Sequence, residues 1–315
     1  HEAWISAGKK TSGTWPEVFG SAPIVNDFFM AWYYATYLEV IVAAGKAEYD
    51  IPMFTNAALI RPNYLPGQYN SGGPLPHSKD IYRAGAPHID FISPDIYFQN
   101  FAYWGGRYNS DGNPLFVPET YSGEAGAGNA YYAFGQLDAI GFSPFGIDAF
   151  YGPPAGPGGA TQNPLAAAYS TIDHLSQKIV EKQGTDKLSG IVLEGSEQRS
   201  GRISLGGYDV TINWASQPQM QNNQGNAMAI YQRVGILFLQ ESEDEFLIAG
   251  SGSATLSFAP SSGNQICGIV SIDEEVLVND KWICQRRLNG DENGQGQVLR
   301  LSSAAVVYKV KLYKY

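Results

Sequence analysis

Cysteine, histidine and basic residues are scarce in this chain, and each scarcity argues against a class of ligand. The two cysteines and four histidines form no Cys-x-x-Cys pair and no close histidine cluster, so we expect neither a metal nor another cofactor. Twenty basic residues against thirty acidic ones give a net charge of −10. This balance argues against a nucleic acid partner, because phosphate binding needs positive charge. We also expect no membrane-spanning segment, because no apolar run approaches the roughly 20 residues required.

Apolar and aromatic residues are plentiful by comparison. The hydrophobic fraction is 44% over 315 residues, which is enough for one large domain or two moderate ones. The aromatic residues comprise 20 Tyr, 15 Phe and 6 Trp. Sugar rings pack their C–H faces on aromatic rings, but aromatic residues also fill ordinary cores. The aromatic content is therefore consistent with a carbohydrate ligand without establishing one.

Four short apolar runs, at 52–57, 90–97, 115–120 and 139–148, have the length of parallel strands buried on both faces. Each run ends on polar or aromatic residues. The third ends on Pro118 and Glu119, and the second on Tyr97. A (β/α) barrel carries its chemistry at the carboxyl ends of its strands. These runs thus predict one rim lined with functional side chains, and the alternative for Glu119 is a solvated loop acid.

Helical patterns alternate with these strands. We expect helices at 26–42, capped by Asn26 or Asp27 and ended by Gly45, then at 78–85, at 130–137 after a glycine-rich loop, and at 165–182. Four strand–helix units make half of a barrel, which needs about 250 residues when complete. We therefore predict that residues 1–184 are the C-terminal half of a (β/α)8 TIM barrel. The other half would come from upstream in the same polypeptide or from a separate fragment, in keeping with a helix-like pattern already under way at residues 1–8. A small doubly wound sheet is the alternative.

After residue 184 the helical patterns stop. Short strands separated by Gly, Asn, Asp, Ser and Pro turns predict an antiparallel β-sandwich or jelly roll over residues 185–315. The acids of this region (Glu194, Glu197, Asp209 and those at 241–245) are expected on solvated faces and turns. Cys267 and Cys284 would not lie directly opposite each other on a hairpin that turns at Asn279 and Asp280. A disulfide between them is left open. The strands are expected at 189–192, 202–205, 208–214, 230–240, 245–249, 254–258, 265–272, 281–286, 297–301 and 305–313.

A resemblance to a known family rests on seven segments that span nearly the whole chain. They are TSGTWPEVFG (11–20), FMAW (29–32), GKAEY (45–49), SPDIY (93–97), PE (118–119), AIGFSPFGID (139–148) and RRLNGDE (286–292). Together they resemble retaining glycoside hydrolases of the large (β/α)8 clan. The closer similarity is to family 35, in its β-galactosidase-like branch with a C-terminal sandwich.

The resemblance implies that Glu119, at the end of the seventh barrel strand, is the nucleophile. It also implies an acid/base glutamate in an Asn-Glu pair at the end of the fourth strand. This chain contains no Asn-Glu pair, so that residue is expected upstream. Asp148 is the first reserve for the missing carboxyl if the fold inference fails, followed by Glu17, Asp95 and Glu124.

The remaining site candidates lie at the strand ends or in loops beside them. Tyr97 would donate a hydrogen bond that orients the Glu119 carboxylate. Asn56 would bind a sugar hydroxyl or tie down its strand end. Phe142 and Phe145 would form an apolar wall for the sugar ring, with at least one of them packed in the core. Trp15 and Trp104, expected in loops beside glycines, would stack at the rim or be buried.

The leading prediction is a retaining, exo-acting glycosidase that removes terminal β-galactosyl residues and is incomplete as this chain alone. Alternatives are a non-catalytic carbohydrate-binding or structural protein with a decayed site, or another specificity of the same clan, such as glucosidase, arabinosidase or mannosidase. The expected partners are a β-galactoside or related glycan and the other half of the barrel, with no nucleic acid and no membrane. Homo-oligomerisation and localisation are undecided, although polymeric glycans favour an extracellular or periplasmic place.

Overall fold

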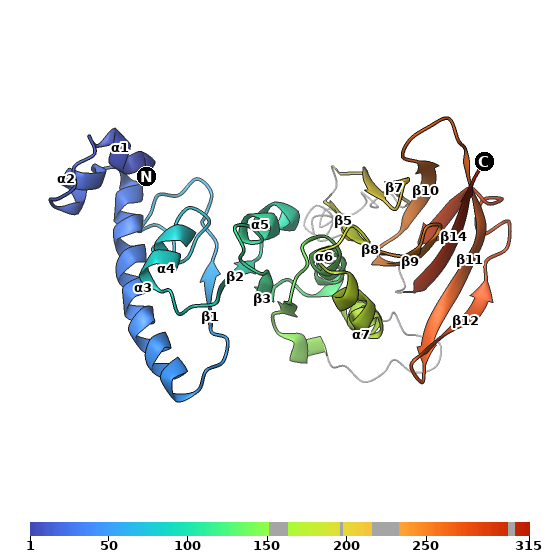
Figure 1. The fold of residues 1–315 in the computed structure, drawn as a ribbon, viewed down its shortest axis with the longest axis horizontal. Helices are drawn as coiled ribbons and strands as arrows, with labels where there is room; N and C mark the ends of the chain where they lie inside the picture. The colour runs from blue at the N-terminus through green and yellow to red at the C-terminus, as the bar shows by residue number, and fades with distance from the viewer. Residues whose placement is uncertain (151–162, 196–197, 216–232, 302–305) are drawn as a thin grey trace, which may run out of the picture. The chain divides into compact units, whose positions relative to one another are not determined.

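The computed structural model describes residues 1–150, 163–195, 198–215, 233–301 and 306–315 (Figure 1). The described chain divides into two compact units. Unit 1 comprises His1–Ile96 with Arg107–Pro118, and unit 2 comprises Tyr97–Gly106 with Glu119–Tyr315. The predicted division by fold type, near residue 184, remains a prediction. The units differ from it because the segments that begin at Tyr97 and at Glu119 belong to the same unit as the antiparallel strands.

Strands and helices alternate in the first part of the described chain. The strands form one sheet in the order β1-β2-β3-β4, and β1 pairs with β2 in parallel, with Phe54 opposite Phe91. Both the alternation and the parallel pairing were predicted. In chain order the elements are α1 (Glu2–Ser6), α2 (Trp15–Phe19), α3 (Pro23–Glu48), β1 (Phe54–Ala58), α4 (Lys79–Gly85), β2 (Phe91–Ile96), α5 (Phe101–Tyr108), β3 (Phe116–Thr120), α6 (Gly123–Gln136), β4 (Gly141–Pro144), the 3-10 helix η1 (Ile147–Phe150) and α7 (Pro164–Lys182).

The rest of the described chain is antiparallel. Its strands form a four-stranded sheet, β13-β10-β7-β6, and a six-stranded sheet, β12-β11-β14-β9-β8-β5. Side chains from both sheets, among them Ile236, Phe238 and Leu256, share one hydrophobic core, as in a sandwich. Strands lie at all ten predicted places: β5 (Leu188–Glu194), β6 (Ser200–Leu205), β7 (Tyr208–Trp214), β8 (Arg233–Ser242), β9 (Glu245–Ser251), β10 (Ala254–Pro260), β11 (Cys267–Val278), β12 (Lys281–Arg287), β13 (Val298–Leu301) and β14 (Val307–Lys314).

The predicted hairpin turn joins β11 to β12. Asn279 and Asp280 have φ values of 50° and 59°, as a two-residue turn between antiparallel strands requires. Cys284 lies opposite Glu275 and Cys267 lies opposite Lys314, so the two cysteines are far apart along the ladder. Both are free thiols.

Helix α3 differs from its prediction at both ends. It begins at Pro23, because proline has no N–H to lose in the first helical turn, and it runs through Gly45 to Glu48. Asp27 is therefore no cap. Its side chain is buried, where Oδ1 accepts a hydrogen bond from the Gly72 amide at 2.5 Å and Oδ2 lies 2.5 Å from Nε2 of His77.

The expectation that no segment could cross a bilayer was wrong for α3. This 26-residue helix is the one helix of the described residues that is long and apolar enough, by length and composition alone. Only 11% of its apolar stretch is buried, and Val40 is 70% exposed. Signal sequences and core helices of soluble proteins meet the same criterion of length and composition, so this feature alone does not assign a membrane span.

The glycine-rich segment before residue 130 was predicted as a loop, but it is the first half of α6. Its glycines allow close approach of other backbone. A Cβ on Gly126 would lie 2.4 Å from the Tyr121 carbonyl oxygen, and one on Gly128 would lie 2.6 Å from Cβ of Arg233 on β8. Because only glycine fits such spacings, these residues mark a packing surface and not a turn.

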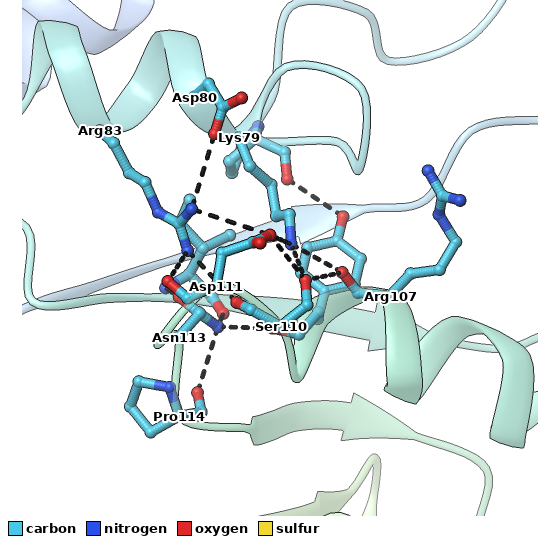
Figure 2. A network of polar contacts seen from close by, with 11 residues as sticks. Lys79, Asp80, Arg83, Arg107, Ser110, Asp111, Asn113 and Pro114 are labelled. Atoms are coloured by element: carbon cyan, nitrogen blue, oxygen red, sulfur yellow. Dashed lines mark hydrogen bonds and ion pairs between the residues drawn. The ribbon is translucent and has the colours of Figure 1, made fainter.

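A polar network within unit 1 fixes the connection between α5 and β3 (Figure 2). Lys79 is 5% exposed, and its Nζ donates to the Arg107 carbonyl and to Oγ of Ser110, both at 2.7 Å. The Asn113 side chain pairs with both backbone groups of Ile92, at 2.8 and 2.9 Å. Since these buried polar groups are satisfied by backbone and neighbouring side chains, we interpret the network as structural.

Candidate active site

The centre of the candidate site is a hydrogen bond between Tyr97 and Glu119. Tyr97 follows β2 directly, and Glu119 is the penultimate residue of β3. The Tyr97 hydroxyl donates to Oε1 of Glu119 at 2.7 Å, and both residues are half-buried. The Tyr121 ring meets the Tyr97 ring edge-on, with centroids 5.1 Å apart. This arrangement confirms the predicted contact, and the role of Tyr97 in orienting a nucleophile stays a prediction.

Phe145 lies at the same end of the sheet as this pair. Its backbone amide donates to the Thr120 carbonyl at 2.9 Å, which places it next to the residue that follows Glu119. Its side chain is 65% exposed. Phe142, by contrast, is 6% exposed and packs edge-on against Phe101 with centroids 5.9 Å apart. The prediction that at least one of the two phenylalanines packs in the core is confirmed for Phe142, and a sugar contact by Phe145 stays a prediction.

Both tryptophans lie in helices, not in the predicted loops. Trp104 is in α5, is 6% exposed, and stacks on Phe98 with centroids 5.2 Å apart. Trp15 is the first residue of α2, in unit 1, and contacts Phe19 and Phe29 at 5.0 and 5.6 Å between ring centroids. Of the two alternatives for Trp104, burial is confirmed and stacking at the rim is wrong, because the ring is 6% exposed and stacks on Phe98.

Asn56 lies on β1 in unit 1 and is exposed. Its amide nitrogen donates to both carboxylate oxygens of Asp95 at 3.2 Å, which agrees with the role of tying down a strand end. A role in sugar binding stays a prediction.

The reserve acids have separate surroundings. Glu17 accepts hydrogen bonds from the amide and hydroxyl of Thr14, both at 2.8 Å, in a capping box that lowers the pKa of its carboxyl. Glu124 and Asp148 are exposed. Within the described residues, no group of three His, Cys, Asp or Glu side chains could hold a metal ion.

Sequence reasoning missed the surroundings of Glu194, which was expected on a solvated face. Glu194 ends β5 and is half-buried, and its Oε1 accepts a hydrogen bond from the Ala102 amide at 3.1 Å. Burial raises the pKa of its carboxyl, while the Ala102 amide and Arg233 act in the opposite direction. A signal was available, because Glu194 closes a continuous apolar run just as Glu119 does.

Two further acids of this region, Asp209 and Glu241, are also paired. Asp209 is 7% exposed and accepts from Arg202 and from the hydroxyls of Ser204 and Ser261. Glu241 accepts from Lys178 at 2.6 Å. The expectation of a solvated face is therefore wrong for Asp209, whose hydrogen bonds to Ser204 and Arg202 lower the pKa of its carboxyl. Glu197 lies outside the described residues.

Comparison with known proteins identifies one matching family model, described as a domain of unknown function, DUF5597, over residues 165–300. No curated protein matches the chain. The matched segment runs from α7 through most of β13 and therefore contains Glu194 and Arg233. Tyr97 and Glu119 precede it.

Proposed function

We propose that this chain is part of a retaining glycosidase that removes terminal β-galactosyl residues, with Glu119 as the nucleophile. The observation that supports this most is the 2.7 Å hydrogen bond from the Tyr97 hydroxyl to Oε1 of Glu119 at the end of β3. It leaves a half-buried carboxylate held in one direction by a phenol, which suits a group that must attack one ring carbon.

The proposed reaction is a double displacement. An oxygen of Glu119 bonds to the anomeric carbon as the bond to the leaving oxygen breaks, and an acid donates its proton to that oxygen. The same group then takes a proton from water, whose oxygen bonds to the anomeric carbon and releases Glu119. Two carboxyl groups about 5–5.5 Å apart are required. We propose that the second belongs to an Asn-Glu pair outside residues 1–315.

We further propose that four more strand–helix units complete a (β/α)8 barrel with this sheet. Two features support the proposal. The sheet has two edge strands, β1 and β4, and an open edge needs a cover. Helix α3 also exposes large apolar side chains, including Tyr37 at 65% and Val40 at 70%. An apolar surface of this kind marks an interface.

Phe145 is the proposed apolar contact for the sugar ring. The ring of Phe145 is exposed, and the Phe145 amide donates a hydrogen bond to the carbonyl of Thr120, the residue that follows Glu119. The C–H face of galactose could pack on this ring while Glu119 approaches the anomeric carbon. Phe142 is left out of this role because Phe101 covers it.

Replacement of the nucleophile tests the proposal. In the full-length protein that contains this chain, Glu119→Gln should lower kcat for an aryl β-galactoside by about 10⁴-fold, because the amide cannot form the glycosyl intermediate. Glu181→Gln, which changes an exposed acid on α7 that is no site candidate, is the matched control and should keep wild-type turnover.

A 2-deoxy-2-fluoro-galactosyl substrate with a good leaving group adds a direct readout. Fluorine at C2 destabilises the oxocarbenium-like transition state, so the glycosyl–enzyme accumulates. Peptide mass spectrometry should then find the sugar on Glu119. Normal turnover by Glu119→Gln, or the sugar attached to another carboxylate such as Asp148, would refute the assignment. Binding of galactosides without turnover would favour the carbohydrate-binding alternative.

A further inference from the structure

The segment that carries Tyr97 is held by two charged side chains from the antiparallel sheet. Arg233 Nη2 donates to the Gln99 carbonyl at 2.7 Å, two residues after Tyr97. Oε1 of Glu194 accepts from the Ala102 amide at 3.1 Å, five residues after Tyr97. Glu194 on β5 and Arg233 on β8 lie directly opposite each other in the strand pairing. A basic and an acidic side chain on neighbouring strands thus bind the same short segment: Arg233 binds a carbonyl and Glu194 binds an amide.

Both charges are in a setting that disfavours them. Arg233 is 3% exposed, and burial lowers the pKa of its guanidinium, while the charge of Glu194 acts in the opposite direction. Burial likewise raises the pKa of Glu194. Apolar residues in such positions are often as stable as an ion pair, so stability alone is a poor account of why charges stand here. Their contacts with backbone of the Tyr97 segment offer another account.

The segment that follows Glu119 is attached to the same two strands. Helix α6 begins four residues after Glu119 and packs on β8 so closely that a Cβ on Gly235 would lie 1.9 Å from the Gly128 carbonyl oxygen. At its other end, Oε1 of Gln136 accepts from the Gly190 amide of β5 at 3.3 Å. Strands β5 and β8 therefore fix both halves of the Tyr97–Glu119 pair.

We propose that Glu194 and Arg233 are positioning residues for the reaction: they hold segment 97–102 so that the Tyr97 hydroxyl stays on the Glu119 carboxylate. This inference rests on the proposed function for its catalytic consequence. It makes the antiparallel region part of the active unit, in contrast to an appended module that only binds glycans.

Hydrogen exchange and kinetics in the full-length protein test the proposal. Glu194→Ala should speed exchange of the Ala102 amide by about tenfold, the value of one lost hydrogen bond to a charged group. It should lower kcat by about tenfold and change KM less than about twofold, because it disturbs orientation and not binding. Glu194→Gln keeps an oxygen for the Ala102 amide and should recover most of both properties.

The matched control is Arg287→Ala. Asp273 and Arg287 also lie opposite each other on neighbouring strands, β11 and β12, and their hydrogen bonds join the two side chains to each other. This variant should leave exchange at Ala102 and kcat at their wild-type values. Arg233→Ala should lower kcat and speed exchange in segment 97–102, as Glu194→Ala does. If this variant fails to fold, Arg233→Lys keeps the positive charge on a single nitrogen and should change both quantities in the same direction but less.

A double-mutant cycle separates positioning from general destabilisation. In a Tyr97→Phe background, Glu194→Ala should lower kcat by less than about twofold, because its effect acts through the phenol that is already gone. An equal loss in both backgrounds would overturn the proposal, as would exchange at Ala102 that matches the Arg287→Ala control. The exchange measurement needs no sugar. It therefore shows whether Glu194 holds segment 97–102 even if Glu119→Gln stays active. If exchange is unchanged while Glu119→Gln is inactive, this inference is wrong and the proposed function still stands.

Discussion

The strand–helix region and the antiparallel region differ in how far their large apolar side chains are buried. In the antiparallel region, large residues such as Ile236 and Leu256 are 0% exposed, because two sheets face each other across them. On helix α3, Ile41 is 49% exposed and Val40 is 70% exposed. The antiparallel region thus buries its apolar side chains between its own sheets, whereas α3 leaves large apolar side chains exposed. This difference is what the proposed cover of α3 has to explain.

The largest expected difference between the two regions is in the free energy of unfolding, when one isoleucine in each is replaced by alanine. Ile236→Ala should lower the free energy of unfolding by about 2–5 kcal/mol, since it removes buried carbon and leaves a cavity. Ile41→Ala in the isolated 315-residue chain should change it by less than about 0.5 kcal/mol, as surface substitutions do. Urea unfolding of both variants checks this, and equal losses would show that α3 is already covered in the isolated chain.

A charge placed on α3 sharpens the comparison. Val40 and Val180 are both 70% exposed, the first on α3 and the second on α7. If further strand–helix units cover α3, Val40→Asp should destabilise the full-length protein by about 1–3 kcal/mol, because it buries an unpaired carboxylate, whereas Val180→Asp should be nearly neutral. Thermal unfolding of both variants provides the measurement. Equal and small shifts would contradict the proposed cover.

Much of this fold could be predicted because apolar periodicity is a local signal. The runs around Glu119 and Tyr97 and the strands after Leu188 all lie where the pattern indicates. The errors came from residues whose role depends on distant neighbours. Gly128 was interpreted as a loop residue, yet it is glycine because Arg233 lies against it, more than a hundred residues further along the chain.

The candidate site likewise contains one contact that local patterns predict and one that depends on a distant segment. Glu119 and Tyr97 close apolar strands that are neighbours in the sheet, so their contact follows from the order of the strands. Glu194 binds a backbone amide of a segment ninety-two residues away. The apolar run before Glu194 indicates that its carboxyl is partly buried, but a backbone partner carries no side-chain signature, so the sequence does not indicate which segment Glu194 binds.

The smallest effect concerns unfolding in acid, and we compare one carboxyl of lowered pKa from each region. Hydrogen bonds from Arg287 lower the pKa of Asp273 on β11, and one from Nζ of Lys46, 2.7 Å away, lowers that of Asp90 in the other unit. A folded pKa below the unfolded value of about 3.9 stabilises the fold at higher pH, and this contribution is lost as the pH falls through the folded pKa.

Asp273→Asn should therefore make unfolding less dependent on pH below about 4, and Asp90→Asn should do so less. The reason is exposure: the Asp273 side chain is 11% exposed and that of Asp90 is 39% exposed, so water screens the second pair more strongly. Urea midpoints at pH 6 and pH 3 for the two variants and the unmodified chain measure the difference. A larger loss of pH dependence for Asp90→Asn would mean that the Lys46–Asp90 pair is shielded from water, which would extend the expected cover of α3 to the end of that helix.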